Sequence, residues 1–135
     1  MEEFFNVEVK NHKKLNKKII YIEYIKEDFF PSLETVKKMI KFYIDTLLKY
    51  EDKKIVVFNL DGIKNYSKKL VWEGASEFRK CEEVLLKNLD SVYIINSNNI
   101  ANFFLNIVMK ETGNKIDTKF VLNFEKVVLD LAKRL

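Results

Sequence analysis

The chain has 135 residues, of which 47% are hydrophobic and 33% are charged, a composition typical of one globular domain and not of a disordered chain. Its longest apolar runs fall far short of the ~20 residues that cross a bilayer, so we expect no membrane span. The formal net charge is +4, but the lysines are interleaved with 20 acidic residues, which predicts a solvated charged surface and no nucleic-acid partner.

Two strands are predicted at the start of the chain. Residues 4–9 alternate loosely between apolar and polar side chains, and residues 19–25 are a β-branched and aromatic run of strand length. The polar segment 11–18 between them is expected to be a loop that joins two antiparallel strands. His12 falls in this loop, where a solvated imidazole is the simplest interpretation.

A helix is predicted to follow the second strand. Phe29-Phe30-Pro31 ends the strand, Ser32 can cap a helix, and Glu34 suits the positive end of the helix dipole. Apolar residues then recur at intervals of three and four, as in a helix packed on a sheet. They are Leu33, Val36, Met39, Ile40, Tyr43, Ile44, Leu47 and Leu48.

The central strand is predicted over residues 55–60, a nearly continuous apolar run typical of a strand that is buried on both faces. We expect Val56 and Phe58 to be buried there, and the change Phe58→Ala to cost about 3–5 kcal/mol of stability. Asp61-Gly62 ends the strand in a turn, and polar residues lead into a second helix. The apolar stripe of that helix is Val71, Ala75, Phe78, Cys81 and Leu85.

The last third of the chain predicts two more strands and two more helices. Residues 91–95 form a strand, followed by the polar run 96–99. A third helix is expected to end near Gly113, and residues 119–122 and 124–135 predict a short strand and a last helix. The apolar stripe of the third helix is Ile100, Phe103, Phe104, Ile107 and Val108.

The predicted order is β-β-α-β-α-β-α-β-α, which indicates an α/β fold with a mixed, mostly parallel five-stranded sheet and four helices in one domain, residues 1–135. Ligands of such sheets usually contact the loops at the carboxyl ends of the strands. We therefore expect a partner-binding surface there, although packing at the core margin is the main expectation for Trp72. The surface comprises Asp61, Gly62, Asn65, Ser67, Lys68, Lys69, Trp72, Asn96, Ser97, Asn98 and Asn99.

The sequence shows no pattern of catalytic, metal-binding or phosphate-binding residues. The chain has one histidine and one cysteine, and only Gly62 follows the central strand, so we expect no metal, no cofactor and no enzymatic activity. Cys81 lies in an apolar stripe, which predicts a buried, inert thiol. Asp61 paired with another carboxylate is the remaining catalytic alternative. A lone cysteine and an N-terminus without a signal pattern predict a cytoplasmic protein.

The order of elements, with Ile-Val-Val-Phe-Asn-Leu-Asp-Gly-Ile at 55–63 and Val-Tyr-Ile-Ile-Asn at 92–96, resembles the STAS and CRAL-TRIO domains. These two families share a related α/β sheet fold. The STAS resemblance implies a regulatory module that binds a partner protein and is switched by phosphorylation in an Asp-Ser-Ser-Gly loop. Residues 65–70 read Asn-Tyr-Ser-Lys-Lys-Leu instead, so the motif is not intact and Ser67 is the candidate phosphorylation site.

The CRAL-TRIO resemblance rests on Leu-Asp-Gly-Ile at 60–63 and on Tyr-Ile-Ile-Asn at 93–96, which leads into Phe103-Phe104. It implies a hydrophobic ligand or lipid in an apolar pocket. No helical lobe precedes residue 4, and a chain of this length has few apolar residues to line a large cavity. A STAS-like protein-interaction module is therefore our first hypothesis and lipid binding the alternative. The sequence leaves homodimer formation open.

Overall fold

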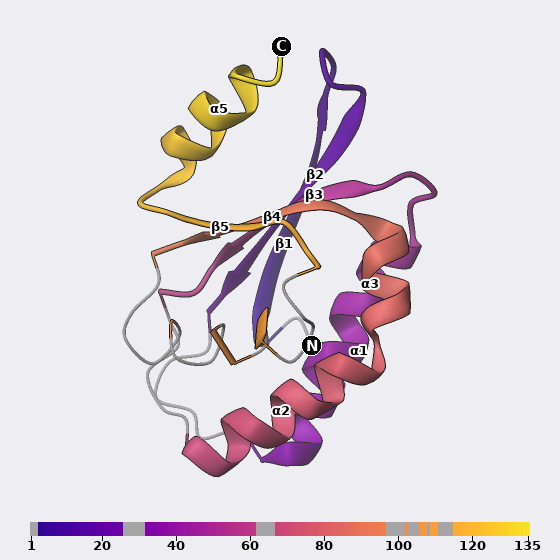
Figure 1. Cartoon of the computed structure of the whole chain (residues 1–135), viewed down its shortest axis with the longest axis vertical. Coiled ribbons are helices and arrows are strands. Elements are labelled where there is room, and N and C mark those ends of the chain that lie inside the picture. Colours follow the sequence, from indigo (N-terminus) through magenta and orange to yellow (C-terminus); the bar gives the residue numbers. More distant parts are fainter. Residues whose placement is uncertain are drawn as a thin grey trace.

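A five-stranded sheet forms the centre of the molecule (Figure 1). The computed structural model describes residues 3–25, 32–61, 67–96, 102, 106–107, 109–110 and 115–135. The strands lie in the order β1-β2-β3-β4-β5, with β1 antiparallel to β2 and every other neighbouring pair parallel. This arrangement confirms the predicted α/β class and the mixed, mostly parallel sheet.

The first two strands, β1 (Phe5–His12) and β2 (Lys17–Tyr24), form a hairpin that is longer than predicted. The expected loop 11–18 was wrong at both ends, because Asn11 pairs with Lys18 and His12 with Lys17. The backbone hydrogen bonds of a hairpin do not require apolar side chains. Asn16 closes the turn with a φ of 53°, a left-handed conformation that asparagine tolerates better than most residues.

Helix α1 (Leu33–Leu48) begins where the sequence predicts. The backbone N–H of Thr35 donates to the Ser32 hydroxyl at 3.2 Å, which confirms the cap, and Glu34 lies in the first turn. Most of the predicted stripe faces the core, and its most buried members are Val36, Ile40, Tyr43 and Leu47. Leu48 corrects the prediction, because 57% of it is exposed in the last turn of the helix.

Strands β3 (Lys54–Asn59) and β4 (Leu89–Ile95) are the most deeply buried. Ile55, Val56 and Val57 are inaccessible to solvent, so β3 is covered on both faces as predicted. Phe58 corrects that prediction, since it is only partly buried against Tyr43, with ring centroids 5.0 Å apart. Phe58 is the residue before the last of β3, where burial decreases toward the end of the strand.

The second predicted helix is divided in two, α2 (Lys68–Lys80) and α3 (Glu82–Asn88). At Cys81 the backbone leaves helical geometry, with φ −98° and ψ 5°, and its N–H donates to the Phe78 carbonyl at 2.9 Å. The apolar stripe nevertheless continues across the break to the buried Leu85. Cys81 is half-buried rather than buried, and desolvation, aided by the charge of Glu77, raises the pKa of its thiol.

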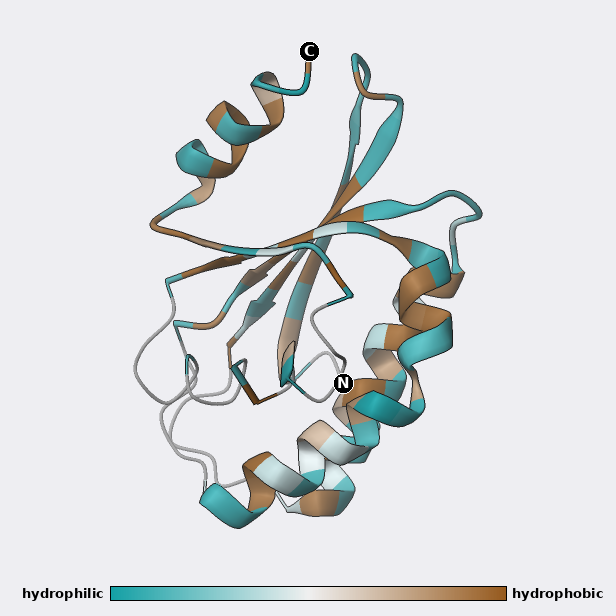
Figure 2. Cartoon of the chain, in the orientation of Figure 1, coloured by the Kyte–Doolittle hydropathy of each residue, from teal (hydrophilic) through white to brown (hydrophobic). Residues whose placement is uncertain are grey.

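The two faces of the sheet are covered unequally. Helices α1, α2 and α3 lie on one face, and α5 (Phe124–Ala132) lies on the other, after the edge strand β5 (Thr118–Val121) (Figure 1). Ile55, Val57 and Tyr93 pack against α5, whereas Val56 and Ile94 belong to the core on the opposite face. Figure 2 shows that hydrophobic residues gather where the strands cross at the centre of the sheet, whereas the hairpin is mostly hydrophilic toward its tip.

The third predicted helix falls mainly outside the described residues, including Ile100, Phe103, Phe104, Val108 and Gly113. Residues 102, 106–107 and 109–110 are helical, and Ile107 packs against Val71 and Ala75 of α2. None of the helices in the described part of the chain is long and apolar enough to cross a membrane.

Candidate functional site

Polar side chains at the carboxyl ends of β2, β3 and β4 form a connected hydrogen-bond network. Asn96 donates from Nδ2 to Oδ1 of Asn59 at 3.3 Å, and Asn59 donates from its own Nδ2 to the Tyr21 hydroxyl at 2.8 Å. The Tyr21 hydroxyl lies 3.5 Å from Oε2 of Glu23, and the backbone N–H of Asp61 donates to Asn59 at 3.2 Å. We call these five residues the asparagine network.

Strand register brings these residues together. Glu23 pairs with Asn59 across β2 and β3, and Asn59 pairs with Ile95, the residue before Asn96. Asn96 has a φ of 53°, so a residue that tolerates left-handed backbone ends β4 at this point. The structure therefore joins two predicted site residues, Asp61 and Asn96, through one that sequence reasoning missed.

Tyr21, Glu23 and Asn59 are the residues that the sequence analysis did not select. A signal for Asn59 was present, because an amide inside an otherwise apolar buried strand needs hydrogen-bond partners. Tyr21 carried no comparable signal, since tyrosine is common in strands. Its ring packs edge-on against Phe124 at 5.9 Å, a contact between residues far apart in sequence.

An open hollow of about 360 Å³ lies beside the network on the α5 side of the sheet. Tyr21, Glu23 and Phe124 line it, together with Glu8 and Lys10 of the edge strand. Lys10 Nζ lies 5.9 Å from the centre of the Phe124 ring. Charged groups of both signs make this hollow suited to a polar ligand and unsuited to an acyl chain.

The first turn of α2 holds the remaining predicted residues that the structure describes. Ser67 is the N-cap, and its hydroxyl accepts from the Leu70 backbone N–H at 3.1 Å. Lys68 and Lys69 are exposed, and Lys69 lies 3.8 Å from Glu73. The hydroxyl of Ser67 thus lies on an exposed residue at the positive end of a helix whose first turn contains no acidic residue.

Trp72 corrects the main expectation for that residue, because 51% of it is exposed. The buried side of α2 consists of Leu70, Val71, Gly74 and Ala75. One residue along a helix is a rotation of about 100°, which takes the indole away from the fully buried Val71 and toward solvent. An exposed tryptophan is an unusual use of a large apolar side chain.

The other sequence predictions have mixed outcomes. Gly62, Asn65, Ser97, Asn98 and Asn99 lie outside the described residues. Among the residues with described positions, no group of three His, Cys, Asp or Glu side chains could hold a metal ion. His12 ends β1 rather than lying in a loop, and its Nδ1 accepts from the Leu15 backbone N–H at 3.2 Å.

Comparison with known proteins gives a match in structure but not in sequence. No family model and no curated protein matches this chain. The crystal structure of an uncharacterized protein of the DUF3478 family from Shewanella loihica PV-4, described as having a SpoIIAA-like fold, superposes with a TM-score of 0.57. The match covers 94% of this chain and 92% of that one, at 12% sequence identity.

The chain has a SpoIIAA-like fold. This is a STAS-like fold, so the resemblance noted in the sequence is confirmed at the level of architecture. At 12% identity the likeness concerns the fold alone. The function of this chain therefore depends on its own residues and does not follow from the fold.

Proposed function

We propose that this chain is a non-enzymatic regulatory module that binds a protein partner through the first turns of α2. The observation that carries the proposal is the half-exposed Trp72 beside the exposed Ser67, Lys68 and Lys69. Tryptophan is enriched among the residues that dominate binding energy at protein interfaces. We call these four residues the α2 surface.

The charge of the α2 surface indicates the chemistry of the partner. Lys68 and Lys69 add positive charge to a helix N-terminus, which already favours anionic groups. An aromatic anchor surrounded by positive charge complements an apolar pocket with an acidic rim. We therefore propose an acidic protein surface as the partner.

Phosphorylation of Ser67 would act directly on this surface. A phosphate adds a charge of about −1.5 to −2 and accepts hydrogen bonds. At the cap of α2 it would be stabilised by the helix dipole and by Lys68, while neutralising the charge that an acidic partner would contact. Phosphorylation is thus proposed to weaken partner binding without unfolding the helix.

A photo-crosslinking residue at the exposed position 76, one helical turn after Trp72, identifies the partner while the tryptophan stays in place, and binding of that partner to defined variants tests the proposal. We expect Trp72→Ala and Lys68→Glu with Lys69→Glu each to raise the dissociation constant at least about tenfold. The matched controls are Leu48→Ala, another exposed apolar side chain, and Lys37→Glu with Lys38→Glu on α1. Equal losses in the control variants would contradict the proposal.

The substitution Ser67→Asp tests the regulatory part of the proposal. Aspartate can replace serine as a helix cap, so the melting temperature should change little. Partner affinity should fall, whereas Ser67→Asn, which also caps but is neutral, should retain it. Unchanged affinity in Ser67→Asp would argue against a switch at this position.

A second candidate is self-association through the outer face of α5. Val128 and Leu129 are exposed on this helix, and Leu122 and Leu135 are exposed close to its two ends. Two copies related by a twofold axis could bury these side chains against each other. This interaction would use the opposite face of the sheet from the α2 surface, so both can operate in one molecule.

A further inference from the structure

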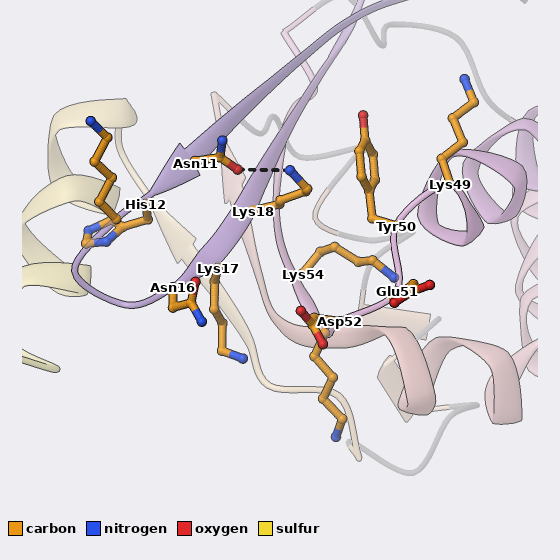
Figure 3. A pocket seen from close by; sticks show the side chains of 12 residues that line it. Asn11, His12, Asn16, Lys17, Lys18, Lys49, Tyr50, Glu51, Asp52 and Lys54 are labelled. Carbon is orange, nitrogen blue, oxygen red and sulfur yellow. Dashed lines mark hydrogen bonds between the residues drawn. The ribbon is translucent and has the colours of Figure 1, made fainter.

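A second, larger hollow lies at the other end of the parallel strands from the asparagine network. Its volume is about 540 Å³, and it lies between the β1–β2 turn and the segment that joins α1 to β3 (Figure 3). The lysines that line it come from these two segments and from the first residues of β2 and β3. They are Lys13, Lys17, Lys18, Lys49, Lys53 and Lys54, and we call the hollow the lysine pocket.

The positive charge of the whole protein is concentrated in this pocket. Six lysines line it against two acidic residues, Glu51 and Asp52, which gives a net charge of +4 with His12 neutral. The whole chain also carries +4, so basic and acidic side chains balance over the rest of the molecule. The fold therefore brings together two lysine-rich segments, near Lys17 and near Lys53, that are far apart in the sequence.

Only part of this charge is compensated within the protein. Lys17 lies 3.5 Å from Asp90, and Lys18 donates to Asn11 at 2.9 Å while its Nζ lies 5.0 Å from the centre of the Tyr50 ring. Lys13, Lys49 and Lys53 are exposed and form no ion pair or hydrogen bond with any described side chain. Three ammonium groups thus remain available to a ligand.

Lys54 supplies a second and independent observation. The side chain is only 1% exposed, and its ammonium donates to the neutral Oδ1 of Asn88 at 2.9 Å. Burial lowers the pKa of Lys54, and the charge of Asp52 partly opposes this effect. The charge of a buried ammonium group is incompletely compensated when its direct hydrogen-bond acceptor is a neutral amide. An anion in the adjoining pocket would compensate the remaining charge.

The geometry points to a binding site for a compact anion that carries two or more phosphate groups. A phosphate monoester carries a charge of about −1.5 to −2, so two of them, at about −3 to −4, match the net charge of the pocket. Lysine binds phosphate as a mobile point charge, which suits a pocket with long side chains on turns. His12 also lines the pocket, and because its Nδ1 contacts the Leu15 backbone N–H, Nε2 is the ring nitrogen left to donate to a ligand.

Titration calorimetry with inorganic tripolyphosphate tests this inference on the intact chain. We expect stoichiometric binding that weakens as salt is raised, because the contacts are electrostatic. The variant Lys13→Gln, Lys49→Gln, Lys53→Gln removes three charges without touching a hydrogen-bonded lysine, and should raise the dissociation constant about tenfold or more. The control Lys37→Gln, Lys38→Gln, Lys126→Gln removes three exposed charges elsewhere and should change it less than about twofold.

Two results would overturn the inference: no binding of tripolyphosphate, or equal weakening in the pocket and control variants, which would indicate a diffuse charge effect. Sedimentation with phosphatidylcholine vesicles, with and without phosphatidic acid, separates the two sources of phosphate. Binding to tripolyphosphate but not to vesicles assigns a soluble ligand, and binding to both assigns a pocket that also accepts lipid headgroups. Binding to phosphatidic acid vesicles alone would contradict the pocket, because a flat charged surface explains it.

Discussion

Asn59 shows how a single polar residue in a buried strand can organise a site. Its side chain both donates and accepts, contacting Tyr21 on one side and Asn96 and the Asp61 backbone on the other. An amide that is partly withdrawn from water on folding gains from hydrogen bonds inside the protein. The neighbouring strands supply the partners, so the ends of β2, β3 and β4 are held in one arrangement.

Phe58 provides the residue-scale test of the core. Because its ring is only partly buried against Tyr43, we expect Phe58→Ala to cost about 2–3 kcal/mol, less than the ~3–5 kcal/mol of a fully buried phenylalanine. Urea unfolding measures this loss. The control Phe120→Ala, on the exposed edge strand β5, should cost less than about 1 kcal/mol. A loss below about 1 kcal/mol for Phe58→Ala would contradict the packing of β3 described here.

At the scale of single elements, α5 is held to the sheet by charged groups as well as by Val127 and Leu131. Asp130 accepts from the Tyr93 hydroxyl at 2.5 Å and lies 2.9 Å from Lys119 Nζ. Just after the helix, Arg134 donates twice to Asp90, at 2.8 and 3.1 Å. A bidentate pair of this kind is stronger than an ordinary surface ion pair.

These contacts change the pKa values of both carboxyl groups. The hydrogen bond from Tyr93, followed by that from Lys119, holds the pKa of Asp130 below its ordinary value. Partial burial acts to raise the pKa of Asp90, but Arg134 and Lys17 outweigh it, and the net shift is downward. A carboxyl whose pKa is lower in the folded than in the unfolded state stabilises the fold above the unfolded value of about 3.9. That stabilisation is lost as the pH falls through the folded value.

We therefore expect Asp90→Asn with Asp130→Asn to lower the free energy of unfolding at pH 6, and the difference from the wild type to shrink below about pH 4. Urea unfolding at pH 6 and pH 3 measures both quantities. The control Asp45→Asn with Glu83→Gln removes two carboxylates from exposed pairs four residues apart, with Lys41 and Lys87, and should have a small effect at either pH. A loss that is equal at pH 6 and pH 3 would contradict an ionic origin.

On the scale of the whole molecule, three features lie in different places. In Figure 1, α2 lies near one end of the long axis, whereas the β1–β2 turn, which contributes residues to the lysine pocket, lies near the other end, and α5 lies beside that turn on the opposite face of the sheet from α2. This separation allows each proposal to be tested without disturbing the others. Variants of one surface serve as folded controls for the other two.

Self-association is the prediction that belongs to this scale. We expect the weight-average mass in sedimentation equilibrium to rise with concentration toward that of a dimer, because burying exposed Val128 and Leu129 is favourable. The variant Val128→Lys, Leu129→Lys should remain monomeric, while Leu48→Lys, which alters an exposed leucine on α1, should behave as the wild type. A wild-type protein that stays monomeric at all concentrations would exclude this contact.

The sequence by itself determined the elements whose signals are local. The Ser32 cap, the apolar stripe of α1 and the apolar run of β3 each follow from residues that are neighbours along the chain. The alternation of strands and helices then limits the possible topologies, because the connection between two parallel strands of one sheet is almost always right-handed. For this reason the α/β class and the mixed sheet were predictable.

Only the tertiary structure decided which distant residues meet. The asparagine network joins Tyr21, Asn59 and Asn96, and the lysine pocket joins two segments more than thirty residues apart in sequence, near Lys17 and Lys49. Strand order and register set these contacts, and both depend on the packing of the complete sheet rather than on any local pattern. The exposure of Trp72 has the same origin, because which side of α2 is buried depends on the elements that pack against it.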